Sequence, residues 1–361
     1  MGGVFSQRTA DIIQRVLILW IMALLVVYGN NATLVAEDIG AMRTTVGAFM
    51  AARFTVMCVY VICSFASFQH RPQVRLMAGL IFVSLLIWIP LYFESVSIRA
   101  KIAVAVVGIV FEEASWILAY GPWIKKKLSL QYSTAVDISH EIDRFAAFFI
   151  IVLGEYLYSI IVGNPAAIGL NSGLLKAVWT LVIAFSLNWI YSVGDGSMDA
   201  THPIRRSAVT AFTFFSIHLP LAASLLVGGH VCAASAGLEE LETGERWLLG
   251  GGLGVGMFCL WFLGMLFKSK DTGCLIMPKT VRIGMRLVVA VILVLLPITS
   301  PDQLNPVQLL SIVMALFAFT VIWETVGGLQ KGARVYEKWD GRNMPRQEDG
   351  ELSGEKSKTF Q

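Results

Sequence analysis

The sequence predicts an all-α protein, a polytopic transmembrane helix bundle of about ten spans. Hydrophobic residues make up 56% of its 361 residues and charged residues only 15%, whereas a soluble domain carries about 25% charged residues. The apolar residues gather in runs of about 20, the length of helix that crosses the hydrocarbon core of a bilayer. Helices are expected because each satisfies its backbone polar groups within one segment.

These runs follow one another along the chain and define the predicted spans. Helix-breaking pairs such as Arg71-Pro72 separate them, and Pro90 and Pro220 are expected to kink the helices that contain them. The predicted spans cover about residues 12–28, 45–68, 75–93, 98–120, 140–162, 174–193, 206–228, 247–267, 283–300 and 307–328.

The composition changes after Gly328, where mixed charges replace apolar residues. Residues 1–328 are therefore predicted to form the transmembrane bundle, and residues 329–361 a polar, partly disordered cytosolic tail. The loops on one side of the bundle hold more Lys and Arg than those on the other, and such loops stay in the cytosol. With ten spans both termini are then cytosolic, in an integral, multi-pass protein that we place in an endomembrane, the endoplasmic reticulum.

Two classes of partner are not expected. The chain has no basic stripe interleaved with aromatic residues, which argues against nucleic acid. Its five cysteines show no Cys-x-x-Cys or Cys/His spacing. We therefore expect no metal site and no disulfide framework.

The fifth predicted span opens with an ionisable cluster and later carries a carboxylate within its apolar part. A charge near the bilayer centre costs roughly 2.5 kcal/mol or more, so it should face protein or a cavity. His140, Arg144 and Glu155 lie on one face at 100° per residue. The alternative is that His140 and Arg144 are simply solvated at a helix end, an explanation that fits Glu155 less well.

Arg53 is a second charge within a predicted span. Counted from the same membrane face, Arg53 and Glu155 lie at nearly equal depth. The sequence therefore predicts a buried Arg53–Glu155 ion pair. Such a pair can serve function or can simply fix helix register.

Glu112 and Glu113 lie next to each other in the fourth predicted span. Neighbouring carboxylates in a low-dielectric site favour the protonated form of at least one, the form that a general acid needs. These two residues have no obvious cationic partner in the sequence, so we expect them to share a proton. The alternative is an interfacial position near a displaced span boundary.

The sixth span ends with Trp189, Tyr191 and the nearby Asp195. Asp195 and Asp199 have the spacing of half a magnesium-diphosphate motif, but the other half, on an earlier helix, is missing. This argues against diphosphate-ionising chemistry and leaves Asp195 as an acid or a helix cap. Trp116, Trp189 and Tyr191 could line a cavity, or anchor the protein at the membrane interface as tryptophans often do.

Residues 140–145 (His-Glu-Ile-Asp-Arg-Phe) and 150–155 (Ile-Ile-Val-Leu-Gly-Glu) together resemble a segment of the low temperature requirement A family of membrane proteins. The resemblance extends to Arg53, to residues 187–191 and to residues 218–220, and covers roughly residues 15 to 330. Asp143 stands where the family commonly has Glu. The Glu-Leu-Phe-Phe-Asp-Leu motif of the family's first span is missing, so any role of its acidic pair is absent or taken over by Glu112 or Glu113.

The resemblance in general plan to fungal membrane-bound terpene cyclases implies acid-initiated cyclisation of a prenylated, epoxidised meroterpenoid precursor, without a cofactor. Such a lipophilic substrate would enter from the membrane lipid. The alternative is a transporter, channel or stress-related protein of the low temperature requirement A type, with Arg53, His140 and Glu155 lining a polar pathway. In the enzyme interpretation the candidate catalytic acids are Glu112, Glu113, Glu155 and Asp195, with the Glu112–Glu113 pair preferred, and the candidate substrate-binding residues are Arg53, Trp116, His140, Arg144, Trp189 and Tyr191.

Overall fold

The computed structural model describes residues 7–32, 34–66, 68–129, 138–162, 169–193, 201–269, 275–299 and 303–332. Over these residues the protein is helical and contains no strand longer than an isolated bridge. The α-helices are α1 (Gln7–Ala32), α2 (Ile39–Ala66), α3 (Arg71–Trp88), α4 (Ile98–Tyr120), α5 (Pro122–Lys127), α6 (Ile138–Ile161), α7 (Ser172–Val193), α8 (Ala208–Ala234), α9 (Thr243–Leu266), α10 (Lys279–Leu295) and α11 (Pro306–Gly327). Short 3-10 helices, η1 (Ile89–Tyr92), η2 (Pro203–Arg205), η3 (Ser235–Gly237) and η4 (Leu296–Ile298), cap or precede several of them.

The predicted fold class is confirmed. Within the described ranges, 9 helical segments are long and apolar enough to cross a membrane. Helix α6 has 24 residues, a similar length, and differs by its charges Glu141, Asp143, Arg144 and Glu155. Helices α1 to α4 and α6 to α11 therefore match the ten predicted spans.

Several helix ends differ from the predicted boundaries. Helix α2 begins at Ile39 instead of residue 45, and α8 continues to Ala234 instead of residue 228. Pro220 lies inside the continuous helix α8, whereas Pro90 lies in η1, where α3 gives way to a 3-10 turn. The short basic helix α5 was not predicted, because its 6 residues are too few to show a periodic pattern.

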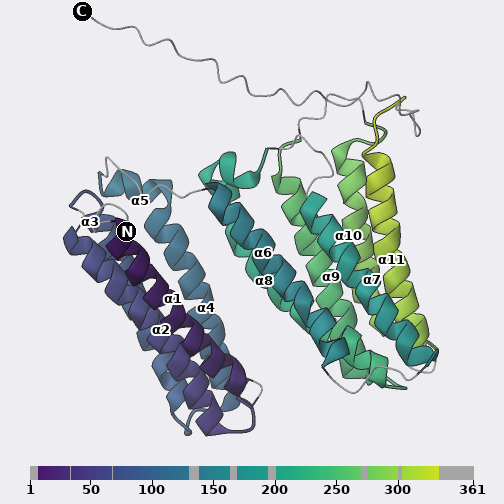
Figure 1. Ribbon diagram of the computed structural model, residues 1–361, viewed down its shortest axis with the longest axis horizontal. Helices are drawn as coiled ribbons and strands as arrows, with labels where there is room; N and C mark the ends of the chain where they lie inside the picture. The colour runs from purple at the N-terminus through teal and green to yellow at the C-terminus, as the bar shows by residue number, and fades with distance from the viewer. Residues whose placement is uncertain are drawn as a thin grey trace, which may run out of the picture.

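The long helices form two bundles, α1 to α4 and α6 to α11 (Figure 1). In the first bundle each helix packs on the next one in sequence: α1 on α2, α2 on α3 and α3 on α4. In the second, α9 packs between α8 and α10, α11 contacts α7 and α10, and α6 packs on α8 and α7. The most extensive helix contacts therefore lie within each bundle.

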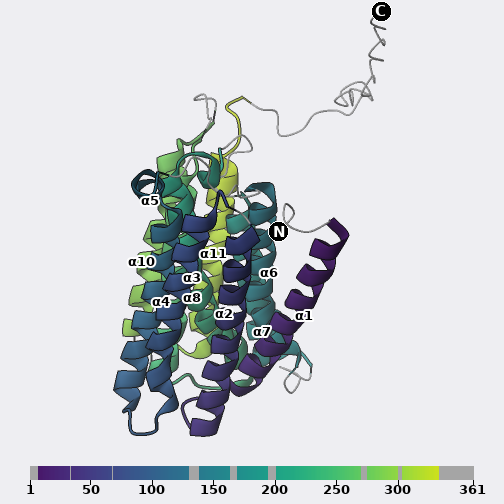
Figure 2. The same ribbon diagram turned by 90° about the vertical axis from the view of Figure 1, so that its left-hand side faces the viewer.

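The two bundles differ in how tightly they are packed. One large cluster of buried apolar side chains runs through α6 to α11, whereas α1 to α4 hold only two small clusters among the described residues. Helix α1 is the extreme case, since no residue in its most apolar stretch is buried. Figure 2 shows it leaning away from the other helices towards its N-terminal end.

Close packing in the second bundle depends on glycines of α9. A Cβ atom at Gly252 would come within 2.8 Å of the backbone of α8 at Gly228 and Ser224, and one at Gly254 within 3.0 Å of the Ala290 carbonyl on α10. Small residues of this kind let transmembrane helices approach closely and gain packing contacts.

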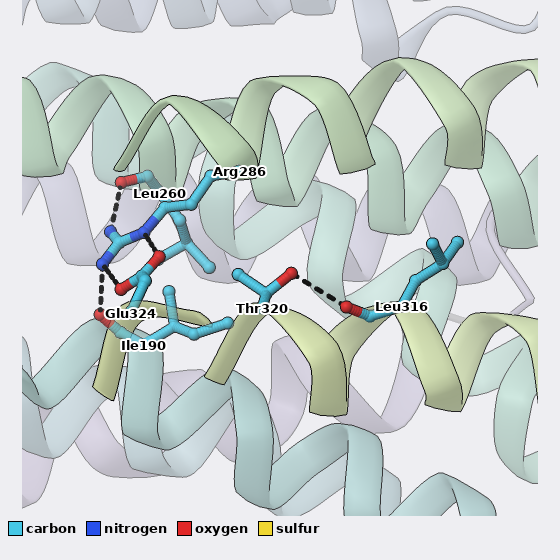
Figure 3. A network of polar contacts seen from close by, with 6 residues as sticks. All are labelled: Ile190, Leu260, Arg286, Leu316, Thr320 and Glu324. Carbon is cyan, nitrogen blue, oxygen red and sulfur yellow. Dashed lines mark hydrogen bonds and ion pairs between the residues drawn. The ribbon is translucent and has the colours of Figure 1, made fainter. Parts of the chain in front are cut away.

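A fully buried ion pair joins α10 to α11 (Figure 3). Both Arg286 Nε and Nη2 lie 2.6 Å from the carboxylate of Glu324, and the two side chains are 1% and 4% exposed. Arg286 also donates to the Leu260 carbonyl of α9 at 2.9 Å and to the Ile190 carbonyl of α7 at 3.3 Å. One guanidinium thus ties four helices together, and we assign this pair to structure.

Helix α1 begins and α11 ends at the same end of the molecule (Figure 1). The basic residues Lys125, Lys126 and Lys127 of α5 lie at this end as well. Such an arrangement agrees with an even number of spans and with the predicted excess of Lys and Arg in the loops of one side.

His202 lies before α8, outside the apolar stretch, and caps η2 by accepting the Ile204 N–H on Nδ1 at 3.3 Å. Burial lowers the pKa of His202 from its ordinary 6.5 to about 4, with smaller contributions from Arg205 and His218. The folded protein thus keeps this imidazole neutral over a pH range in which an unfolded chain would protonate it.

We expect the thermal stability of the folded protein to fall as the pH drops from about 6.5 towards 4, because protonation of His202 then favours the unfolded chain. His202→Asn keeps an acceptor for the Ile204 N–H and should lack this part of the pH dependence. Thermal denaturation in detergent at about pH 7 and about pH 4.5 measures it. Equal losses in the wild type and His202→Asn would contradict the assignment.

Candidate functional site

Two neighbouring carboxylates lie on α4, ~10 Å along the helix axis from its Tyr120 end. Successive helical residues point about 100° apart, so the side chains of Glu112 and Glu113 contact different helices. Glu112 contacts α2 and α3 in the first bundle, and Glu113 contacts α8 in the second.

Glu112 forms the polar centre of the first bundle. Its Oε2 lies 3.3 Å from Arg53 Nη2, and its Oε1 accepts a hydrogen bond from Ser84 Oγ at 2.6 Å. The two charged side chains are 19% and 18% exposed, so water screens the pair little. Arg53 therefore neutralises Glu112.

Glu113 connects the two bundles. Its Oε2 accepts a hydrogen bond from Ser216 Oγ of α8 at 3.1 Å. Among the described residues no cation lies within ion-pair distance of this carboxylate. The carboxylate pair thus has one neutralised member and one member that faces the junction between the bundles.

Both carboxylates line a cavity of about 460 Å³. Its walls come from α1, α2, α3, α4, η1 and α8, and Tyr28, Phe49 and Trp88 add aromatic rings to an otherwise mostly apolar lining. The volume falls within the range of small-molecule sites, about 300–1,000 Å³.

Two polar atoms of cavity-lining residues have no hydrogen-bond partner among the described residues, Thr45 Oγ1 and Trp88 Nε1. On the same helix, Thr44 and Thr55 donate to carbonyls four residues back, as helical hydroxyls commonly do. Thr45, with only 7% of its surface exposed, does not. The cavity therefore combines apolar walls, two carboxylates and hydrogen-bonding groups that the fold itself does not use.

The predicted Arg53–Glu155 pair is wrong. Arg53 pairs with Glu112, and Glu155 lies 3.8 Å from Nδ1 of His230 on α8. Helices α2 and α6 belong to different bundles, so equal depth in the membrane did not make their side chains neighbours. Because Arg53 forms an ion pair with Glu112, the expectation that neither carboxylate has a cationic partner is also wrong.

The remaining charged candidates on α6 lie apart from the cavity. Arg144 forms an ion pair with Glu141 at 3.2 Å, with 57% of its side chain exposed, and His140 is exposed. Glu155 and His230 have 34% and 70% of their side chains exposed. The structure therefore does not bring Arg53, His140 and Glu155 together along one pathway.

The three aromatic candidates do not line the cavity either. Trp116 is 47% exposed and stacks on Tyr120, and Trp189 is 41% exposed. Tyr191 stacks on Phe149 with ring centroids 3.9 Å apart, and its hydroxyl lies 3.0 Å from Nε2 of His218. Asp195 lies outside the described residues.

Several residues of the site were missed in the sequence. Ser84, Ser216, Tyr28, Phe49 and Trp88 are common in membrane helices, so their types alone do not mark a site. The rule that consecutive helices commonly pack side by side places the second and fourth spans next to the third, but it does not by itself pair Arg53 with Glu112. Among the described residues no three His, Cys, Asp or Glu side chains gather as a metal site would require.

Comparison with protein-family models matches residues 5–323 to one model, described as bacterial low temperature requirement A protein (LtrA). The match spans both bundles and includes the α4 carboxylates as well as the α6 segment that first suggested the resemblance. Comparisons with curated proteins and with solved structures gave no match.

Proposed function

Because the chain belongs to the low temperature requirement A family of membrane proteins, we propose that it is a carrier. In this proposal it moves a small solute across the membrane in exchange for protons. The carboxylate of Glu113 binds the solute and the proton in turn. The family match supports a membrane protein of the low temperature requirement A type better than a terpene cyclase, and the carrier function is proposed from the site described above.

The observation that carries the proposal is the place of Glu113 at the junction of the two bundles. Ionisable residues within membrane spans are costly and commonly mark ion or substrate pathways. Carriers commonly bind their substrates within the membrane, between two halves that rock against each other. Here the extensive helix contacts lie within each bundle, and the Glu113–Ser216 hydrogen bond crosses between them.

The difference between the two carboxylates assigns their roles. Glu112 is fixed by Arg53 and Ser84, so a change in its charge would disturb the first bundle. Glu113 accepts only a neutral hydroxyl among the described residues and borders the cavity, so it can bind and release a proton or a cation. In the proposal Glu112 positions α2, α3 and α4, and Glu113 performs the exchange.

A direct test uses the full-length protein in liposomes that contain a pH-sensitive dye. Potassium ions, an amino-acid mixture, a sugar and the organic cation tetraphenylphosphonium are added outside in turn. We expect at least one of them to cause proton movement, and Glu113→Gln to reduce its initial rate at least about tenfold. Glu240→Gln, a change of the same charge in an exposed loop, should behave as wild type. No solute-linked proton movement, or equal rates in Glu113→Gln, would overturn the proposal.

One observation favours the cyclase as a second candidate. Glu113 shares its cavity with the rings of Tyr28, Phe49 and Trp88, which could stabilise migrating positive charge. Membranes that contain the protein would then convert a prenylated epoxide into a cyclic product of the same mass. Chromatography of extracts from membranes with and without the protein distinguishes the two, because a carrier leaves the compound unchanged.

The proposal also includes the orientation. In this proposal the protein lies in an endomembrane. The end of the molecule that holds α5 and the last residues of α11 faces the cytosol, because the lysines of α5 favour that side. Protease protection of tags on the two termini in isolated membranes tests this, and protection of either tag in sealed cytosol-side-out vesicles would contradict it.

A further inference from the structure

We infer that the cavity beside Glu113 binds a lipophilic organic cation, an amine that carries its proton or a quaternary ion with an apolar body. This inference rests on the proposed carrier function and names its substrate class. Three properties of the cavity support it: its charge, its aromatic lining and its position next to the loosely packed helix α1.

The charge of the cavity selects a cation. Its two charged lining residues are both acidic, Glu112 and Glu113. Arg53 compensates Glu112 from outside the lining, which leaves the charge of Glu113 without an opposite charge among the described residues. An organic cation supplies that charge, whereas an anion would meet two carboxylates at a depth where water screens little.

The aromatic lining selects an organic cation over a metal ion. The rings of Tyr28, Phe49 and Trp88 lie in the cavity wall, and aromatic faces attract ammonium-type cations. Trp88 is held in place, because its ring centroid lies 4.7 Å from that of Phe49 and because Gly108 leaves room for it. A Cβ atom at Gly108 would come within 2.9 Å of the Trp88 ring. Apart from the carboxylates, the lining offers few of the oxygen ligands that a small metal ion needs.

The position of α1 offers a route from the lipid. Tyr28 and Ala32 of α1 form part of the cavity wall, and α1 packs mainly on α2. A hydrogen bond from Trp20 Nε1 to Thr55 Oγ1 at 3.0 Å holds it there. Its apolar stretch is otherwise unburied. Figure 2 shows that α1 diverges from the bundle towards its N-terminal end, whereas Tyr28 and Ala32 lie near its C-terminal end. An amphipathic cation dissolved in the bilayer could therefore enter past α1 without crossing a tightly packed interface.

Binding of tetraphenylphosphonium to the full-length protein in detergent tests the inference, with tetraphenylborate as a probe of the same shape and opposite charge. We expect saturable binding of the cation and none of the anion. Glu113→Gln should weaken binding of the cation at least about tenfold, and Trp88→Leu about fivefold. Glu240→Gln should bind as wild type. Lowering the pH should weaken binding of tetraphenylphosphonium to the wild type and have little effect on its binding to Glu113→Gln.

Two controls show whether a loss of binding comes from the lost charge or from misfolding, and the combined results distinguish cation binding from transport. Size-exclusion profiles identify variants that fail to fold, and Glu113→Asp, which keeps the charge, should recover most of the affinity. Equal binding of both probes, or unchanged binding in a folded Glu113→Gln, would overturn the inference. Proton movement driven by potassium or amino acids without binding of tetraphenylphosphonium would overturn the inference and leave the carrier in place. Selective binding without any solute-linked proton movement would support the cation site and overturn the carrier.

Discussion

Arg286→Met is expected to lower the free energy of unfolding of the protein by about 3–5 kcal/mol, the usual cost of removing one member of a buried ion pair. The substitution would leave the Glu324 carboxylate, 4% exposed, without its cation in the protein interior. It would also remove the donors to carbonyls of α7 and α9. We expect little monodisperse protein after extraction, measured as the fraction that survives heating before size-exclusion chromatography.

Two further variants show whether the pair itself is responsible. Adding Glu324→Leu to Arg286→Met removes the unpaired charge and should recover more than half of the loss. Arg144→Ala, which breaks an exposed ion pair, should change stability by less than about 1 kcal/mol. If Arg286→Met proved as stable as Arg144→Ala, the structural role of the pair would be wrong.

Substitution of Glu112 is expected to lower the stability of the protein, and substitution of Glu113 to impair its function without lowering stability. Glu112→Gln should cost about 2 kcal/mol, because it leaves Arg53 in a largely buried position without its counter-charge. Glu113→Gln should leave stability nearly unchanged, since the amide oxygen can still accept the hydrogen bond from Ser216. The same heating and size-exclusion assay, run on both variants beside the wild type, measures this difference.

A double variant tests the cause in Glu112→Gln. Adding Arg53→Met removes the unpaired cation, while the glutamine still accepts from Ser84, so most of the lost stability should return. If Glu113→Gln were less stable than Glu112→Gln, Glu113 would have a structural role in holding the two bundles together. That result would contradict its assignment as the group that performs the exchange.

Most of the fold could be predicted because the signals that define spans are local. Apolar runs of membrane length, prolines and polar connectors identified the ten long helices among the described residues, and α4 was predicted with its observed ends, Ile98 and Tyr120. What failed was the lateral arrangement. The position of a residue along its helix predicts its depth in the membrane but not which helices are neighbours. For this reason the sequence predicted a pair of Arg53 with Glu155, whereas Arg53 pairs with Glu112.

The candidate site could be predicted only in part, for the same reason. Glu112 and Glu113 were identified because charges stand out in an apolar helix, and their different surroundings became visible only with α2, α3 and α8 in place. Arg286 was missed because it lies near the start of its span, where a charge is also expected at the membrane interface. The α6 motif carried the family resemblance, yet its residues Arg144 and Glu155 lie apart from the cavity.

The central claim is that the carboxylate at position 113 performs the exchange. The most direct measurement is the initial rate of solute-linked proton movement in liposomes that contain equal amounts of folded wild type, Glu113→Asp and Glu113→Gln. The account predicts that Glu113→Asp keeps a substantial part of the wild-type rate, because it retains a group that binds a proton or a cation, and that Glu113→Gln falls at least about tenfold. A wild-type rate in Glu113→Gln would contradict it.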